Sequence, residues 1–273
     1  MDWSKIKTIF IISFLILDLY LVYEFFKIWD ESQYEVVKPE VEESIEKRLK
    51  VDEIEYVTLP KSFVEDYYLK AKPKEFKEED LVDNSTLKNQ TTKVTAGTIL
   101  ESELNEPLKV SDKFGPSELN SFIKNHILYG DEYRYWEESN DDKMIIYTQH
   151  FEGKTLFEND NGKLIFYLND NNEIESYRQT YLEEIVKLSK SEKIIQPIKA
   201  IETLYSNDFI KPKSSITEVE LGYYTLVDES AQVLNPAWCF VVDGKEKLFV
   251  SAFEGKIVEL KEKEKEKDKS IVE

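Results

Sequence analysis

Near the amino terminus, the nineteen residues from Thr8 to Phe26 are apolar apart from Asp18 and Glu24. As a helix they would span about 28 Å, close to the hydrocarbon thickness of a bilayer. Two lysines precede the run and acidic residues follow it, which orients the amino terminus toward the cytoplasm. The pattern predicts a cytoplasmic stub over residues 1–7, a transmembrane helix over residues 8–28 and an extracellular remainder. The segment lacks the small-x-small motif of a signal-peptide cleavage site, so we expect an uncleaved anchor rather than a cleaved signal peptide.

Asp18 lies in the middle of this apolar run. A carboxylate at the bilayer centre costs roughly 2.5–3.5 kcal/mol, which the neighbouring aliphatic residues can offset. The cost falls if Asp18 faces another helix, so we expect the span to pair laterally with a partner helix. The alternative is that Asp18 is protonated and merely tolerated. The predicted partner face consists of Ile11, Phe14, Leu15, Asp18, Leu21, Val22 and Phe25.

Residues 29–112 are expected to form a membrane-proximal α+β segment. Pro39–Lys50 begins with proline and acids and ends with bases, as a helix does when its charges complement its dipole. Asp52–Pro60 is typical of a strand that ends at proline. Lys93–Leu104 indicates another strand, with an interruption at Gly97.

The rest of the chain repeats one pattern. Ser117–Gly130 and Gln196–Ile210 each have apolar residues at helical spacing, and each is followed by a series of strand-like segments. The ends of the two series align, Lys163–Ile174 with Lys247–Val258. Each end reads as a strand, a turn and a second strand.

This repeat defines the expected fold class, α+β. We predict two lobes, residues 113–188 and 189–261, each a helix packed on one face of an antiparallel meander similar to PepSY or cystatin domains. The final residues, 262–273, belong to a segment of alternating charge with no apolar face. We interpret that segment as a solvated terminus rather than a binding tail.

Charge and cysteine content narrow the functional classes. The chain has 36 basic and 55 acidic residues, a net charge of -19. This argues against nucleic-acid binding, which depends on Lys and Arg at phosphates, and it disfavours docking on anionic lipid. Cys239 is the single cysteine, so no intramolecular disulfide can form. For an exported protein this is typical of a Gram-positive-type surface.

No catalytic, cofactor-binding or metal-binding residues are predicted. The two histidines, His126 and His150, lack zinc-site spacing, and we expect the first on a helix surface and the second in a strand. Cys239 lies in an apolar strand and is expected to be a buried, inert thiol. No glycine-rich phosphate loop occurs. Asn161-Gly162 is interpreted as a type I′ hairpin turn.

Two aromatic segments, Tyr133–Glu138 and Leu221–Leu226, alternate in a way that places aromatic residues on one face of a sheet. A packed sheet face is the expected role, and a protein interface is the alternative.

The amino terminus, MDWSKIKTIFIISFLILDLYLVY, resembles the start of the YycI family of membrane-anchored regulators. The segment PAWCFVVDGKEKLFVSAFEGKI (Pro236–Ile257) is similar to the end of that family and to PepSY-type strands. Ala252, Gly255 and Ile257 stand where the PepSY pattern has these residues.

The resemblance implies a non-enzymatic regulator that acts together with a YycH-like protein on a WalK-like sensor histidine kinase. That kinase governs cell-wall metabolism. Contact would run through the transmembrane helices, with help from the extracellular domains. The family is known both to repress and to activate the kinase. Two alternatives remain open: a PepSY-like inhibitor of a secreted protease and a surface enzyme that acts on the cell wall.

Overall fold

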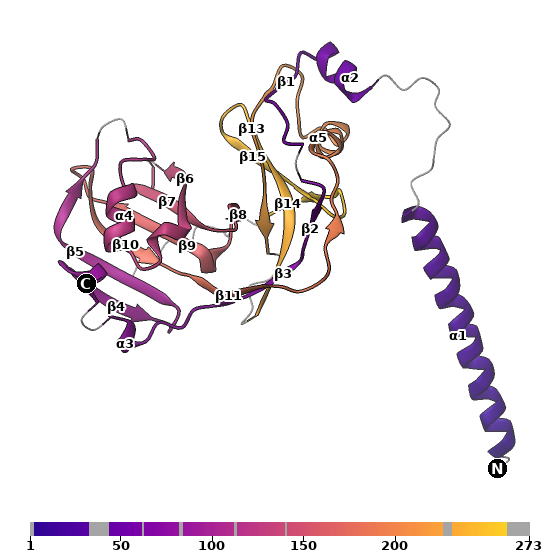
Figure 1. Ribbon diagram of the computed structural model, residues 1–273. Coiled ribbons are helices and arrows are strands. Elements are labelled where there is room, and N and C mark those ends of the chain that lie inside the picture. Colours follow the sequence, from indigo (N-terminus) through magenta and orange to yellow (C-terminus); the bar gives the residue numbers. More distant parts are fainter. Residues whose placement is uncertain are drawn as a thin grey trace. The chain divides into compact units, whose positions relative to one another are not determined.

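The computed structural model describes residues 3–32, 44–61, 63–81, 84–111, 114–139, 141–225 and 231–260 (Figure 1). The chain divides into two compact units, Met1–Ser44 and Ile45–Glu273. The predicted tail of alternating charge lies outside the described residues.

The first unit contains one long helix, α1 (Trp3–Ser32), which includes the whole predicted span. Its apolar side chains are exposed wherever they are described, for example Phe14 at 58% and Leu21 at 54%. Among the described residues, no helix combines the length and the apolar character that crossing a membrane requires.

The second unit is rich in strands and has few helices, so the expected α+β class is observed. Its α-helices are α2 (Ile45–Val51), α3 (Glu78–Leu81), α4 (Asn120–His126) and α5 (Pro197–Ser206). Short 3-10 helices occur at Ser85–Leu87, Gly130–Glu132 and Asp160–Gly162. Its strands up to the middle of the chain are β1 (Glu55–Tyr56), β2 (Glu65–Asp66), β3 (Leu69–Pro73), β4 (Gln90–Thr95), β5 (Ile99–Lys109), β6 (Tyr133–Ser139), β7 (Met144–Phe151) and β8 (Lys154–Phe157). The later strands are β9 (Lys163–Leu168), β10 (Glu173–Gln179), β11 (Leu182–Lys187), β12 (Glu192–Lys193), β13 (Ser215–Tyr224), β14 (Gln232–Val242), β15 (Glu246–Ser251) and β16 (Ile257–Val258).

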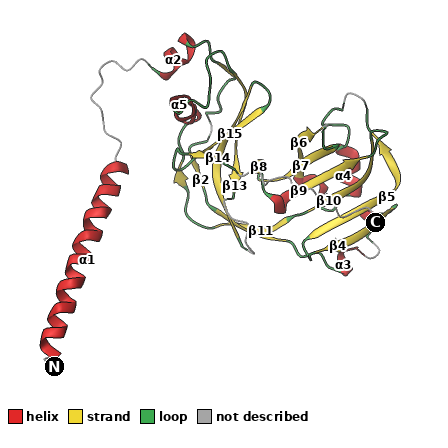
Figure 2. Ribbon diagram, turned by 180° about the vertical axis from the view of Figure 1, so that it is seen from behind, coloured by secondary structure: helices red, strands yellow, loops and turns green. Residues whose placement is uncertain are grey.

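Helix α4 covers one face of antiparallel strands in the order β6, β7, β9, β10, β5, β4 (Figures 1 and 2). Alternation along the strands explains the packing, since every second residue points to the same face. Ile145 and Tyr147 of β7 and Leu164 and Phe166 of β9 are buried in one cluster with Ile123 of α4.

Helix α5 lies in a second hydrophobic cluster with strands β13, β14 and β15. Ile201 and Leu204, three residues apart on α5, meet Trp238 and Phe240, two residues apart on β14. Because these residues follow the helical period on α5 and the strand period on β14, the two elements bury their apolar faces against each other. Leu49 of α2 joins the same cluster.

Strand β8 connects these regions, because it pairs antiparallel with β7 and parallel with β13. β3 lies between β14 and β11 and is antiparallel to both. The described strands thus join into one 14-stranded network, together with a small ribbon of β2 and β12.

Several predicted elements are found. Both repeat helices form, as α4 and α5. The aligned segments are both antiparallel strand pairs, β9 with β10 and β15 with β16. The division into two lobes stays a prediction, because the contacts keep Ile45–Glu273 in one unit.

Other elements differ from the sequence-based expectation. The described part of the predicted helix Pro39–Lys50 is helical only from Ile45. The predicted strand Asp52–Pro60 shrinks to Glu55–Tyr56, where β13 lies alongside as a partner. The predicted strand with an interruption at Gly97 is a hairpin of two strands, β4 and β5. Its turn is possible because Ala96 and Gly97 both adopt left-handed backbone conformations.

The type I′ turn predicted at Asn161-Gly162 is wrong. Such a turn needs positive φ at both central residues, and neither is among the residues with positive φ. The segment is instead the 3-10 helix Asp160–Gly162, which the Asn159 side chain caps by accepting from the Asn161 N–H at 2.9 Å. The strands on either side, β8 and β9, do not pair with each other but flank β7 separately.

Candidate functional site

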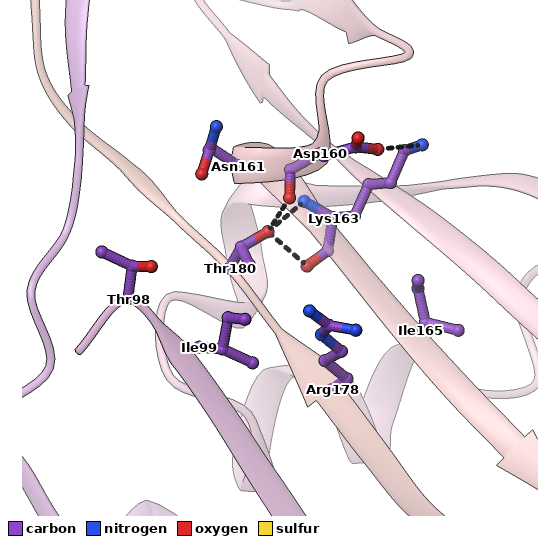
Figure 3. Close-up of a pocket in the computed structure, with 8 residues that line it drawn as sticks. All are labelled: Thr98, Ile99, Asp160, Asn161, Lys163, Ile165, Arg178 and Thr180. Atoms are coloured by element: carbon purple, nitrogen blue, oxygen red, sulfur yellow. Dashed lines mark hydrogen bonds and ion pairs between the residues drawn. The ribbon is translucent and has the colours of Figure 1, made fainter. Parts of the chain in front are cut away.

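One hollow on the surface lies where β9, β10 and the start of β5 meet (Figure 3). Its volume is about 440 Å³. Figure 3 shows the Arg178 side chain between Ile99 and Ile165, with Lys163, Asp160 and Thr180 above it. The remaining lining residues are Thr98 and Asn161.

The reactive groups of this hollow are already engaged. Lys163 lies 2.9 Å from Asp160 and 3.4 Å from Glu158. Burial acts to lower the pKa of the Lys163 ammonium, but these two carboxylates outweigh it and raise the pKa. The Thr180 hydroxyl donates to the Asp160 carbonyl at 2.7 Å and accepts from the Lys163 N–H at 3.0 Å. The hollow therefore offers neither a free base nor an activated hydroxyl.

The predicted burial of Cys239 in a strand is confirmed. Cys239 lies in β14 and is 3% exposed. Burial is the main cause that raises the pKa of its thiol, and Glu220 adds to the effect. A thiol with a raised pKa is a poor nucleophile and a poor metal ligand.

The two histidines lie in α4 and β7. His126 is half-buried at the end of α4, and its ring stacks on that of Phe122 with centroids 5.1 Å apart. His150 is in β7, where burial and then Arg134 lower its pKa. In the part of the chain that the structure describes, no three Asp, Glu, His or Cys residues cluster closely enough to hold a metal ion.

Both aromatic segments contribute to packing. Tyr133, at the start of the first segment, is buried, and its hydroxyl donates to the Thr180 carbonyl. Tyr223 and Tyr224, in the second, are 3% and 6% exposed. The burial of these residues agrees with the expected role as the packed face of a sheet. The last residue of the second segment, Leu226, lies outside the described residues.

A buried ion pair and the hydrogen bonds to it join three separate parts of the chain that no sequence pattern connects. Asp66 of β2 is 1% exposed, and its Oδ2 lies 2.6 Å from the Lys154 ammonium of β8. The Tyr223 hydroxyl of β13 donates to Asp66 Oδ1 at 2.6 Å, and the Tyr67 N–H donates to the same oxygen at 2.9 Å. Asp66 is one of 55 acids, so no local pattern distinguishes it.

A second set of contacts links β15 with β6. Lys247 of β15 lies 3.8 Å from the ring centroid of Trp136 in β6 and 2.6 Å from Glu137. The Trp136 N–H donates to Glu158 at 2.9 Å. Strands β6 and β15, which belong to different hydrophobic clusters, are thus tied by an ion pair and a cation–π contact.

The family described as YycI protein matches residues 32–253, which is most of the chain. The chain belongs to the YycI family. No curated protein matches this YycI-family chain.

Three solved structures are similar to the YycI-family chain. An uncharacterized protein from Eubacterium rectale ATCC 33656 is 11% identical, with 77% of this chain and 92% of that one covered and a TM-score of 0.45. The YpeB C-terminal domain of Bacillus megaterium is 13% identical, with 68% and 97% covered and a TM-score of 0.41. YycH from Bacillus subtilis is 12% identical, with 72% and 56% covered and a TM-score of 0.39.

The predicted partner face of this YycI-family chain lies on α1. Its six residues with described side chains are all exposed: Ile11, Phe14, Leu15, Asp18, Leu21 and Val22. Phe25, the seventh, belongs to the same helix. Binding through this face stays a prediction.

Proposed function

We propose that this YycI-family chain is a non-enzymatic regulator of a WalK-like sensor histidine kinase that controls cell-wall metabolism. It would act with a YycH-like protein, anchored in the cell membrane by Thr8–Phe26 with its amino terminus inside and the rest outside. The observation that carries the proposal is the family match over residues 32–253, which supports a role in the WalK pathway.

The membrane anchor is supported by the sequence of α1. Nineteen consecutive residues contain only two charges, Asp18 and Glu24. A polar residue within a bilayer is expected to face another helix or a polar cavity. Asp18 is therefore the residue through which we propose that α1 meets a helix of the kinase or of the second regulator.

One contact of this kind cannot switch a kinase. Moving an equilibrium from 1:99 to 99:1 requires about 5.5 kcal/mol of differential binding. A polar contact between helices in a bilayer contributes on average about 0.6 kcal/mol. The rest must come from further contacts, so we propose that the unit Ile45–Glu273 also binds the assembly.

We also propose that the outer part consists of two related repeats. Helix α4 is followed by a meander of β6, β7, β9 and β10, and α5 by a meander of β13, β14, β15 and β16. The shared order of elements supports this interpretation. In such a repeat, β8 is an insertion in the first meander only.

Crosslinking in intact membranes, followed by identification of the partners, tests the proposal. We expect the kinase and the YycH-like regulator to be recovered. Recovery of a secreted protease instead would favour the inhibitor alternative. Turnover of wall polymer by the purified chain would favour the enzyme alternative.

The substitution Asp18→Leu tests the part that α1 plays. We expect weaker recovery of the partners and a changed kinase output, because the polar contact is lost. Ser13→Leu is the matched control, since it also replaces a polar residue of α1 but on a different face of the helix. If Asp18→Leu leaves recovery and kinase output unchanged, contact through this helix face is wrong.

A further inference from the structure

An exposed aliphatic strip lies on the ribbon formed by β11, β3 and β14. Val186 of β11 and Val233 of β14 both stand opposite Lys70 of β3 in the strand register. Val186 is 53% exposed and Val233 is 44% exposed. Leu188, two residues after Val186, is 52% exposed and donates its N–H to the carbonyl of Tyr68, which directly precedes β3. We call Lys70, Val186, Leu188 and Val233 the β11 strip.

The opposite face of the same ribbon is fully packed. Leu69 and Ala71 of β3, Leu182 of β11 and Leu234 of β14 are buried together. Since side chains alternate along a strand, burial of one face leaves the other free to carry polar residues. Exposed aliphatic residues on neighbouring strands of that free face are typical of a surface that contacts another molecule.

Lys70 differs from Lys72 and Lys74, the other two lysines in and beside β3, in its charge partners. Lys74 and Lys72 are paired with acids near the start of β11: Lys74 lies 3.4 Å from Glu183, and Lys72 contacts Glu183 and Glu184. In the described ranges, no acid lies within ion-pair distance of Lys70, although the chain carries 55 acidic residues. A single ammonium among aliphatic groups is complementary to a carboxylate with aliphatic neighbours.

The free edge of β11 supplies backbone groups for the same partner. β11 ends the strand order and pairs only with β3 in the described part of the chain. The hydrogen bond from Leu188 to Tyr68 faces β3, so by antiparallel alternation the N–H and C=O of Lys187 face away from it. An exposed edge of this kind accepts an added strand.

We propose that the β11 strip binds an extended segment of a partner protein, which pairs along the edge of β11 and sets a carboxylate against Lys70. Aliphatic side chains of that segment would cover Val186 and Leu188. One lysine on a chain of net charge -19 gives little attraction to an anionic lipid surface, so the occupant is a protein. The inference rests on the proposed function only in that the partner belongs to the proposed regulatory assembly.

Thiol labelling of the full-length chain tests this inference, because the native Cys239 is buried. The variant is Val186→Cys, and the matched control is Val51→Cys, at an exposed position (73%) outside the strip. We expect a membrane-impermeant maleimide to label position 186 about tenfold more slowly in cells than in the purified chain, as when a site is covered for roughly nine-tenths of the time. Position 51 should label at equal rates in both.

Substitutions at Lys70 test whether the strip binds a carboxylate of the partner. In the Val186→Cys background, Lys70→Glu should restore rapid labelling in cells, because the partner carboxylate would be repelled. Lys70→Arg should keep the protection. An unchanged melting temperature for both Lys70 variants shows that the fold is intact, and a photo-crosslinker at position 186 should attach to an acidic, aliphatic segment.

Three results would overturn the inference: equal labelling of position 186 in cells and in the purified chain, protection that Lys70→Glu leaves unchanged, or protection of the purified chain that grows with its concentration. The last would assign the strip to a second copy. Recovery of the kinase with a fully reactive position 186 would contradict this inference alone. Protection at position 186 without recovery of the kinase would contradict the proposed function alone.

Discussion

Gly222 of β13 lies against the ring of Phe157 in β8. A Cβ atom at position 222 would come within 2.4 Å of the ring Cζ and within 2.4 Å of the Thr155 carbonyl oxygen. The parallel pairing of Tyr223 with Leu156 brings the two strands to this spacing. Glycine at this position is therefore a condition for the pairing of β8 with β13.

The substitution Gly222→Ala should lower the free energy of unfolding by about 1–3 kcal/mol or more, the usual cost of forcing an extra methyl group into a packed core. Denaturant unfolding of the full-length chain measures it. Gly115→Ala is the control and should have little effect, because no atom lies within 4 Å of a Cβ at position 115. Equal stability of the two variants would contradict the argument.

Loss of the Lys154 ammonium should be costly. Lys154→Met leaves the Asp66 carboxylate buried without its cation, and breaking a buried pair in this way costs roughly 3–5 kcal/mol. Adding Asp66→Asn removes the stranded charge while the side chain can still accept from Tyr223 and Tyr67. The double variant should be more stable than Lys154→Met in the same unfolding measurement. A less stable double variant would refute this account.

Glu220 should make the stability depend on pH. Burial raises the pKa of the Glu220 carboxyl above its ordinary 4.5, against the lowering effect of the Thr155 hydroxyl, which donates to it. The fold then holds this proton more tightly than the unfolded chain does. Its contribution to stability is complete below pH 4.5 and is lost as the pH rises through the folded-state pKa.

Glu220→Gln removes this titration. The stability of the variant relative to the native chain should rise with pH from about 4.5 upward and then level off. Urea unfolding at a series of pH values gives the profile. Thr155→Val removes the donor to Glu220 and should widen the pH range over which stability is lost. Parallel profiles for Glu220→Gln and the native chain would exclude this role.

Cys239 should react with thiol reagents only when the chain opens. Its side chain is buried in β14, and burial raises the pKa of the thiol. A disulfide reagent at pH 8 should modify the denatured chain rapidly and the native chain slowly. Val51→Cys, which introduces an exposed thiol, is the positive control. Rapid modification of native Cys239 would contradict the packing described for this strand.

The parts of the fold that follow a local period could be predicted from the sequence. Ile201 and Leu204 lie on one helical face, and Leu164 and Phe166 on one strand face, so each element could be recognised by itself. The thiol of Cys239 was predictable for the same reason, since its neighbours in the strand are apolar.

The parts that depend on distant partners could not be predicted. The 3-10 helix at Asp160–Gly162 exists because β8 leaves the meander to pair with β13, and no residue near Gly162 signals this. Asp66 is buried only because Lys154 and Tyr223 come to it from elsewhere in the chain. The β11 strip likewise requires the register that places Val186 and Val233 on either side of Lys70.

The pairing of β1 with β13 sets a condition on folding. Glu55 aligns with Ser215, so a strand near the start of the unit Ile45–Glu273 pairs with one made 160 residues later. Contacts of such long sequence separation slow folding. During synthesis, β1 stays without this partner until Ser215 has been made, and an unpaired strand edge is prone to aggregate in that interval.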